Sequence, residues 1–311
     1  MKSADSLLRQ LEYTVLKRLD GLLQGDYRTW SRGQGVDLAD LREYQPHDDV
    51  RHIDWNVTAR LDVPHVRRYI EDRDLTAWFL LDATASVDFG SDQTTKLDLA
   101  AGFVGVLARV LTRHGNRVGA LRYTGKVDTV LPPRSHRMQV LHVIDALRRP
   151  APKNPQGTAL ADLLRSAESL VRRRSLIFIV SDFISAPGWE APLARLAQRH
   201  EVLAVRLNDG ADVELPAWGL VTLEDAETGE QLFVDAGDAK LRRRYTELAA
   251  QAEDELVAAL QRSGADTLEL ATGDDLLEAL LRFAHLRRQR ARMKPSVRWP
   301  RHGAAVVGAG A

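Results

Sequence analysis

Residues 176–182, LIFIVSD, and residues 76–82, TAWFLLD, decide the fold of this chain. Each is a short apolar run that ends in an aspartate, and such runs are typical of strands buried on both faces of a parallel sheet. Segments with helical spacing of apolar residues alternate with these runs, which indicates right-handed β-α-β crossovers. The sequence therefore predicts an α/β fold: a doubly wound, mainly parallel sheet of Rossmann-type topology.

The rest of the main domain follows the same alternation. Between residues 208 and 238 it is interrupted by a predicted hairpin around Thr228-Gly229, with strands at 221–223 and 231–234. The other expected strands are 118–123, 127–131, 202–207 and 267–270, and the expected helices are 96–112, 137–147, 158–171, 189–198, 239–263 and 274–288.

The chain divides into three parts by composition. Residues 1–75 start with an amphipathic helix at 4–23 and continue as a polar, aromatic stretch with glycines and prolines, which predicts a small N-terminal helix-plus-strand module. Residues 76–285 form the α/β domain, with an insertion at about 208–240. Residues 286–311 are basic and are expected to be a flexible tail, since no acidic residue follows Glu278.

Composition excludes several classes of function. The chain has 311 residues, with 43 Lys and Arg against 43 Asp and Glu, so no global charge directs it to nucleic acid. It has no cysteine, which excludes disulfides, thiolate zinc sites and iron–sulfur clusters. The first residues lack the apolar core of a secretory signal, and no apolar stretch is long enough for a membrane span. We expect a cytoplasmic protein.

Oxygen-bearing side chains gather where the ends of the central strands are predicted. Asp82 and Asp182 end two buried strands, and ligands of open α/β sheets bind at that edge. Thr84, Ser86 and Thr158 add hydroxyls, and this all-oxygen set suits Mg²⁺, with Mn²⁺ or Ca²⁺ as alternatives. Two carboxylates only just neutralise a dication, which leaves a position for water or for an acidic side chain of a partner. The plainer alternatives are that Thr158 caps a helix and that Asp182 is a turn residue.

The series Asp82-x-Thr84-x-Ser86, Thr158, Asp182 resembles the metal-ion-dependent adhesion site of von Willebrand factor A-type domains. Thr84 stands where that site usually has serine, which keeps the hydroxyl and adds a methyl group. The resemblance implies that Thr84, Ser86 and Thr158 contact the metal directly. It also implies that Asp82 and Asp182 act through water or hydrogen bonds.

A second resemblance covers residues 33 to 285. The stretch LREYQPHDDVRHIDW at 41–55, followed by Thr58-Ala59-Arg60, is similar to the signature of the bacterial domain-of-unknown-function 58 family, with His47 in place of a glycine. The resemblance implies that the protein acts together with a MoxR-type AAA+ ATPase, either in maturing other protein complexes or in inserting metal into them. The signature residues carried over are Arg42, Tyr44, Asp48, Asp49, Arg51, Asp54, Trp55 and Arg60.

Physically, the signature suits an ion-pair and hydrogen-bond network that fixes this segment onto the A-type domain, because Arg–carboxylate forks rigidify without chemistry. A partner-binding surface is the alternative interpretation, since exposed Trp and Arg are typical binding anchors.

Motifs for catalysis are missing from the sequence. Gly33-Gln34-Gly35 is incomplete as a dinucleotide site, Gly119 to Lys126 has the wrong spacing for a P-loop, and no G-x-S-x-G or H-E-x-x-H occurs. We therefore expect no enzyme but a divalent-cation-dependent adaptor that binds a Glu or Asp of a protein partner. The alternatives are a metal-dependent hydrolase such as a phosphatase, with Asp88 or Asp92 as its nucleophile or general base, and nucleic-acid binding by the basic tail.

Overall fold

The computed structural model describes residues 37–45, 48, 50–70, 75–90, 94–152, 158–226 and 228–281. The helix expected at 4–23 and the basic tail at 286–311 lie outside these residues. Within the described part of the chain, no helix is both long and apolar enough to cross a membrane.

One six-stranded sheet organises the main domain, in the order β10-β7-β6-β3-β4-β5. All neighbours are parallel except β4 and β5, so the prediction of a doubly wound, mainly parallel sheet is confirmed. The strands are β3 (Thr76–Asp82), β4 (Arg117–Tyr123), β5 (Val127–Arg134), β6 (Leu176–Ser181), β7 (Glu201–Asn208) and β10 (Asp266–Ala271).

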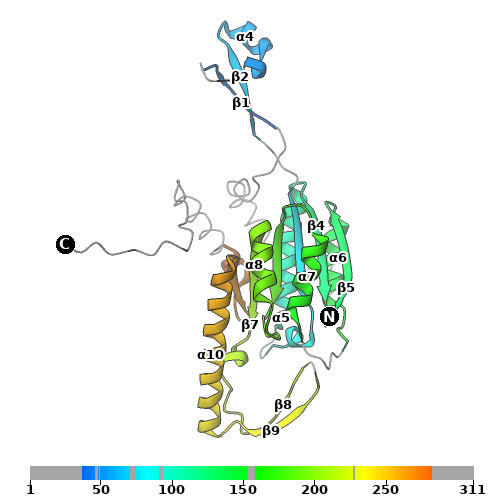
Figure 1. The fold of residues 1–311 in the computed structure, drawn as a ribbon, viewed down its shortest axis with the longest axis vertical. Coiled ribbons are helices and arrows are strands. Elements are labelled where there is room, and N and C mark those ends of the chain that lie inside the picture. Colours follow the sequence, from blue (N-terminus) through cyan, green and yellow to red (C-terminus); the bar gives the residue numbers. More distant parts are fainter. Residues whose placement is uncertain are drawn as a thin grey trace, which may run out of the picture.

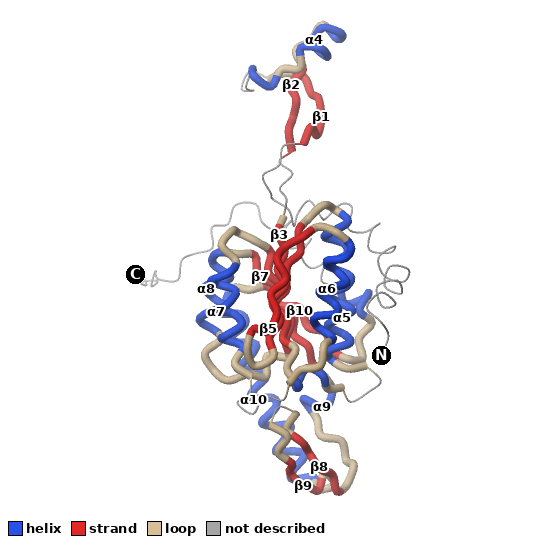
Figure 2. Tube along the Cα trace, turned by 90° about the vertical axis from the view of Figure 1, so that its right-hand side faces the viewer, coloured by secondary structure: helices blue, strands red, loops and turns tan. Residues whose placement is uncertain are grey.

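Helices cover both faces of this sheet (Figure 2). The long α10 follows the insertion and packs against α8, and residues 276–281 are helical after β10. The helices are α5 (Lys96–Arg113), α6 (Arg137–Arg148), α7 (Leu160–Leu170), α8 (Glu190–Arg199) and α10 (Ala239–Ser263), together with the short 3-10 helix η3 (Ala85–Asp88) after β3.

Alternation along β3 divides the core into two layers. Ala77, Phe79 and Leu81 pack with α5 and α6, whereas Trp78 and Leu80 pack with α7 and α8. Phe79 stacks on Phe178 of β6 with ring centroids 4.9 Å apart. Because both faces of the strand are covered, it reads as one continuous apolar run rather than as an alternating pattern.

The edge strand β5 is the one strand in which the expected end is wrong. We expected Pro132-Pro133 to close it, but it continues through both prolines to Arg134. Proline is tolerated at a sheet edge because its missing N–H would face away from the ladder. The pairing of β4 with β5 is also irregular between Val118 and Ala120.

A buried asparagine joins the start of β3 to the end of α5. The side chain of Asn116 accepts a hydrogen bond from the Leu75 amide at 3.1 Å and donates to the Leu111 carbonyl at 3.1 Å. It thereby fixes the strand that delivers Asp82 to the sheet edge.

We expect Asn116→Ala to lower the free energy of unfolding by about 1–3 kcal/mol, because it removes the acceptor of the part-buried Leu75 amide and the donor of the buried bond to the Leu111 carbonyl. Urea denaturation would measure this loss. A change below about 0.5 kcal/mol, which is usual for an exposed position, would show that Asn116 does not fix the strand.

Two smaller elements leave the main sheet. The insertion contains the one-turn α9 (Gly210–Val213) and a hairpin of β8 (Leu220–Glu224) and β9 (Gln231–Asp235), so the predicted hairpin is confirmed. The N-terminal lobe comprises β1 (Asp37–Glu43), η2 (Val50–His52), α4 (Trp55–Leu61) and β2 (His65–Ile70), with β1 and β2 antiparallel. In Figure 1 this lobe and the hairpin lie at opposite ends of the main domain.

Candidate functional site

The centre of the sheet is its topological switch point. β3 and β6 are adjacent and parallel, and the chain proceeds outward from them in opposite directions. Asp82 is the last residue of β3, and Asp182 directly follows β6. Because Leu81 pairs with Val180, the two aspartates reach the same edge of the sheet, where ligands of open α/β folds bind.

The Asp82 carboxylate is fully buried and held by three hydrogen bonds. Its Oδ1 accepts from the Thr84 amide at 3.2 Å and from Thr84 Oγ1 at 2.7 Å, and its Oδ2 accepts from Ser181 Oγ at 2.7 Å. Burial, followed by the negative charge of Asp182, raises the pKa of Asp82 to about 7, although the hydrogen bonds act in the opposite direction. The group is therefore poised to gain or lose a proton near neutral pH.

The two hydroxyls after β3 face the same place. Thr84 stands at the N-cap of η3, and its Oγ1 lies 3.2 Å from Ser86 Oγ. The short helix turns the chain so that alternate residues, 84 and 86, present their side chains together. The structure therefore brings Asp82, Thr84 and Ser86 into one hydrogen-bonded series.

Thr158 lies at the same edge, buried between β4 and the segment after β6. Its carbonyl accepts from the Ala186 amide at 2.9 Å and from Ser185 Oγ at 3.2 Å. The next amide, of Ala159, donates to the hydroxyl oxygen of Tyr123, which pairs with Asp82 across the sheet. The N-cap of α7 is Ala159, so Thr158 stands one residue outside the cap position considered for it.

Asp182 meets a buried lysine. Its Oδ1 accepts from the Ile184 amide at 3.0 Å, and its Oδ2 forms an ion pair with Lys96 Nζ at 3.3 Å. Lys96 is the first residue of α5, its side chain is 1% exposed, and its Nζ also lies 3.0 Å from Asp212 Oδ2 of α9. Burial raises the pKa of Asp182, although the Lys96 ammonium lowers it.

Three of these groups were missing from the sequence prediction. Ser181 could have been suspected, since it precedes Asp182 in the same run. Lys96 and Asp212 carry no local signal, because Lys96 precedes Asp182 by 86 residues and Asp212 by 116. Only the folded chain shows that the edge holds a positive charge of its own.

The hydroxyl and carboxylate oxygens at this edge together form a donor set of the kind that suits a hard divalent cation. The described residues contain no group of three or more His, Cys, Asp or Glu side chains that could hold a metal on their own. A cation at this edge would therefore depend on Asp82, Thr84, Ser86, Thr158 and Asp182 as a mixed set. Asp88 of η3, considered above as a nucleophile or general base, is exposed, and Asp92 lies outside the described residues.

The signature residues form bonds within the N-terminal lobe. Arg42 Nη2 lies 2.6 Å from Asp48 Oδ1, and Asp54 caps α4 by accepting from the amides of Asn56 and Val57. Trp55 is 69% exposed. The lobe is drawn apart from the sheet in Figures 1 and 2. That the signature fixes this segment onto the main domain stays a prediction.

The other signature residues are placed as follows. The Tyr44 amide donates to the Pro64 carbonyl at 2.8 Å, which joins the end of β1 to the start of β2. Arg51 and Arg60 are exposed, and Asp49 lies outside the described residues.

Fold and site together define an α/β domain with a doubly wound, mainly parallel sheet and polar side chains at its carboxyl edge. The sequence model of the family described as "Protein of unknown function DUF58" matches residues 40–255, so the chain belongs to that family.

Relatives and solved structures were also compared with the chain. It is 40% identical over 291 residues to Uncharacterized protein Rv1480 of Mycobacterium tuberculosis strain H37Rv, covering 91% of this chain and 90% of that one. An aerotolerance-related membrane protein from Bacteroides fragilis aligns over 71% of this chain and 100% of its own, with 16% identity and a TM-score of 0.45. The SpRpn10 VWA domain aligns over 67% and 94%, with 12% identity and a TM-score of 0.39.

Proposed function

We propose that the protein is a non-enzymatic adaptor that binds a partner protein through a divalent cation, Mg²⁺ in the first place, at the carboxyl edge of the sheet. The observation that carries this proposal is the convergence of Asp82, Thr84, Ser86, Thr158 and Asp182 on one edge at the switch point. Such a set of carboxylate and hydroxyl oxygens offers the hard donors that Mg²⁺ prefers.

The charges favour an acidic ligand from the partner. Lys96 offsets the charge of one of the two carboxylates Asp182 and Asp212. A dication bound beside ionised Asp82 would neutralise the charge of the remaining carboxylates, which leaves little excess negative charge at the site. An open coordination position would then attract a Glu or Asp of a partner. The family resemblance suggests a MoxR-type AAA+ ATPase as that partner, which would supply the ATP hydrolysis.

Asp82→Asn tests the cation site while keeping the volume of the side chain. We expect Mg²⁺ affinity, measured by isothermal titration calorimetry on the full chain, to fall about 10–100-fold, as is typical when a group supporting metal ligands is lost. The matched control is Asp88→Asn, which removes a nearby exposed carboxylate and should leave Mg²⁺ affinity unchanged. Equal affinities in all three proteins would contradict the proposed site.

Partner capture is the second readout. The wild-type chain should retain the MoxR-type ATPase of the same cell in Mg²⁺ and release it in chelator, and Asp82→Asn should not retain it. Capture that is indifferent to both chelator and substitution would exclude a cation-mediated contact. Turnover of phosphoester substrates that depends on both Mg²⁺ and Asp82 would instead favour the hydrolase alternative.

A further inference from the structure

The insertion between β7 and α10 has an unusual charge. From Asn208 to Ala239 the sequence contains nine Asp or Glu residues and no Lys or Arg, although the whole chain is neutral. Five of the nine lie in the hairpin itself: Glu224, Asp225, Glu227, Glu230 and Asp235. Lys96 offsets Asp212, but the hairpin residues 220–235 contain no Lys or Arg, and this excess of negative charge attracts cationic partners and repels anionic ones.

The same hairpin exposes large apolar side chains. Leu220 is 86% exposed and Phe233 is 79% exposed, and the cross-strand register places both on the face that also carries Thr222. The opposite face of the two strands is apolar throughout, with the paired residues Val221 and Val234, and Leu223 and Leu232. Exposed aromatic and aliphatic groups gathered in this way are typical of interaction sites.

The base of the hairpin is fixed, whereas its strands contact little besides each other. The Ala236 amide donates to the Gly219 carbonyl at 2.7 Å, and Arg242 of α10 donates to the Ala236 carbonyl at 2.7 Å. Among the described helices and strands, β8 and β9 contact no other element to a comparable extent. A two-stranded ribbon without a packing partner is marginally stable, so an occupant would stabilise it.

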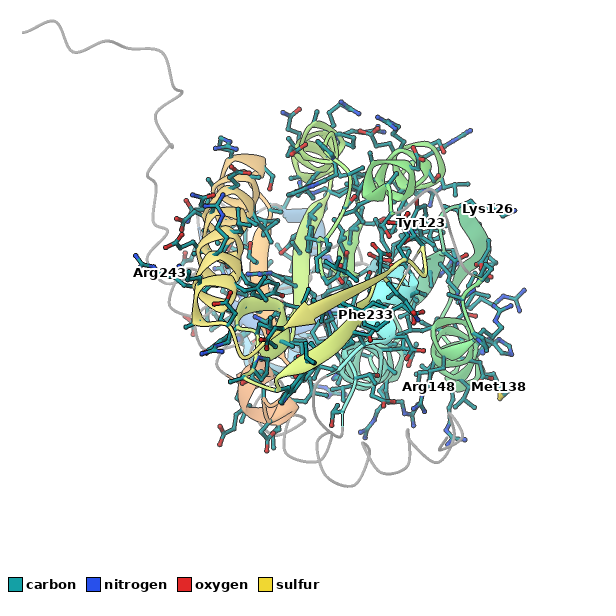
Figure 3. All side chains as sticks on the ribbon, turned by 90° about the horizontal axis from the view of Figure 1, so that it is seen from below. Tyr123, Lys126, Met138, Arg148, Phe233 and Arg243 are labelled. Carbon is teal, nitrogen blue, oxygen red and sulfur yellow. The ribbon has the colours of Figure 1, made fainter. Side chains whose placement is uncertain are left out.

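The hairpin lies beyond the carboxyl edge of the sheet. Figure 1 shows β8 and β9 below the ends of the central strands, and in Figure 3, seen from below, they cross in front of the sheet with Phe233 among them. The hairpin therefore lies on the side of the molecule where Asp82 and Asp182 reach the sheet edge.

We infer that the β8–β9 hairpin is a docking arm for a basic, apolar segment of a partner protein. Charge complementarity specifies the occupant, because an acidic ribbon with apolar faces matches Lys or Arg residues alternating with aliphatic ones. Nucleic acid and anionic membranes are excluded as occupants by the sign of the charge. The attraction needs no cation, so this surface is independent of the proposed metal-dependent contact.

A labelled peptide of alternating lysine and leucine is the probe, with lysine–serine and glutamate–leucine peptides as controls. Fluorescence anisotropy with the full chain should show binding of the lysine–leucine peptide alone, weakened by salt and unchanged by chelator or by Asp82→Asn. The double substitution Leu220→Ser with Phe233→Ser should weaken binding at least tenfold. Leu170→Ser, at an exposed leucine of α7, is the matched control and should have no effect.

A second variant tests charge without removing apolar contacts. Glu224→Gln combined with Glu230→Gln should weaken binding several-fold and reduce its salt dependence. Equal binding by the hairpin variants and the wild-type chain would overturn the inference. A tenfold or larger rise in peptide affinity after truncation at residue 281 would also overturn the inference, since the chain's own basic end would then be the occupant. So would a loss of self-association in the hairpin variants, since a second copy of the chain would then be the occupant.

Discussion

Replacing Lys96 by methionine is expected to lower the free energy of unfolding by about 3–5 kcal/mol at pH 8, because it leaves the buried Asp182 carboxylate without its cation. The methionine would fill much of the same volume, so the loss reports charge rather than a cavity. Both side chains of the ion pair are almost completely buried, and Nζ and Oδ2 are 3.3 Å apart. A surface pair would contribute less than about 1 kcal/mol.

The loss should be smaller in acid. Without Lys96, the pKa of Asp182, already raised by burial, would rise further. The native variant would then bind a proton that the unfolded chain releases, so its stability would decrease as the pH rises above the ordinary aspartate value. Urea denaturation at pH 5 and pH 8 would measure the difference.

Three further proteins make the Lys96 result interpretable. Lys126→Met removes an exposed lysine after β4 and should change stability by no more than about 0.5 kcal/mol. The double variant Lys96→Met with Asp182→Asn should recover much of the lost stability, because neither buried charge remains. Asp182→Asn alone completes the comparison: if its loss and that of Lys96→Met simply added in the double variant, the ion pair would not be the source of the effect.

The strands of the main sheet could be predicted from the sequence because burial on both faces leaves a strong local pattern. TAWFLLD and LIFIVS are continuous apolar runs, and each became a central strand with the expected end. The one-turn α9 was missed, since it comprises four residues stabilised by the capping box of Asp209 and Asp212 and lacks any helical period. Pro132 and Pro133 misled because proline is excluded from central strands, whereas β5 is an edge strand with one side unpaired in the sheet.

The candidate site was predictable where its residues follow strands and unpredictable where they come from elsewhere. Asp82, Thr84, Ser86 and Asp182 are placed by two strand ends, so parallel topology alone brings them to one edge. Lys96 is the first residue of α5, and nothing in the neighbouring sequence distinguishes it from an exposed lysine at the start of a helix. Its partner Asp212 is placed by the one-turn α9 directly after β7, where the insertion begins, and no periodicity or motif in the sequence encodes that contact.

The stability of the metal-free protein is expected to fall as the pH rises from about 4 to about 7, because of Asp82. Its pKa is about 7 in the folded chain against an ordinary value of 3.8, so in this window the folded state binds a proton that the unfolded state has released. The free energy of unfolding therefore decreases with pH and becomes level above about pH 7. Asp82→Asn should reduce this slope, while the raised pKa of Asp182 retains part of it.

A divalent cation should reverse the trend, because it binds the ionised carboxylate and competes with the proton. At pH 8, saturating Mg²⁺ should raise the free energy of unfolding by about 2.7 kcal/mol when its concentration is 100 times the dissociation constant. At pH 5 the same concentration should have little effect, since Asp82 is protonated there. Mg²⁺ stabilisation of equal size at both pH values would mean that the cation binds away from Asp82. In that case Mg²⁺ would stabilise Asp82→Asn as much as it stabilises the wild-type chain, which a parallel titration of the variant would show.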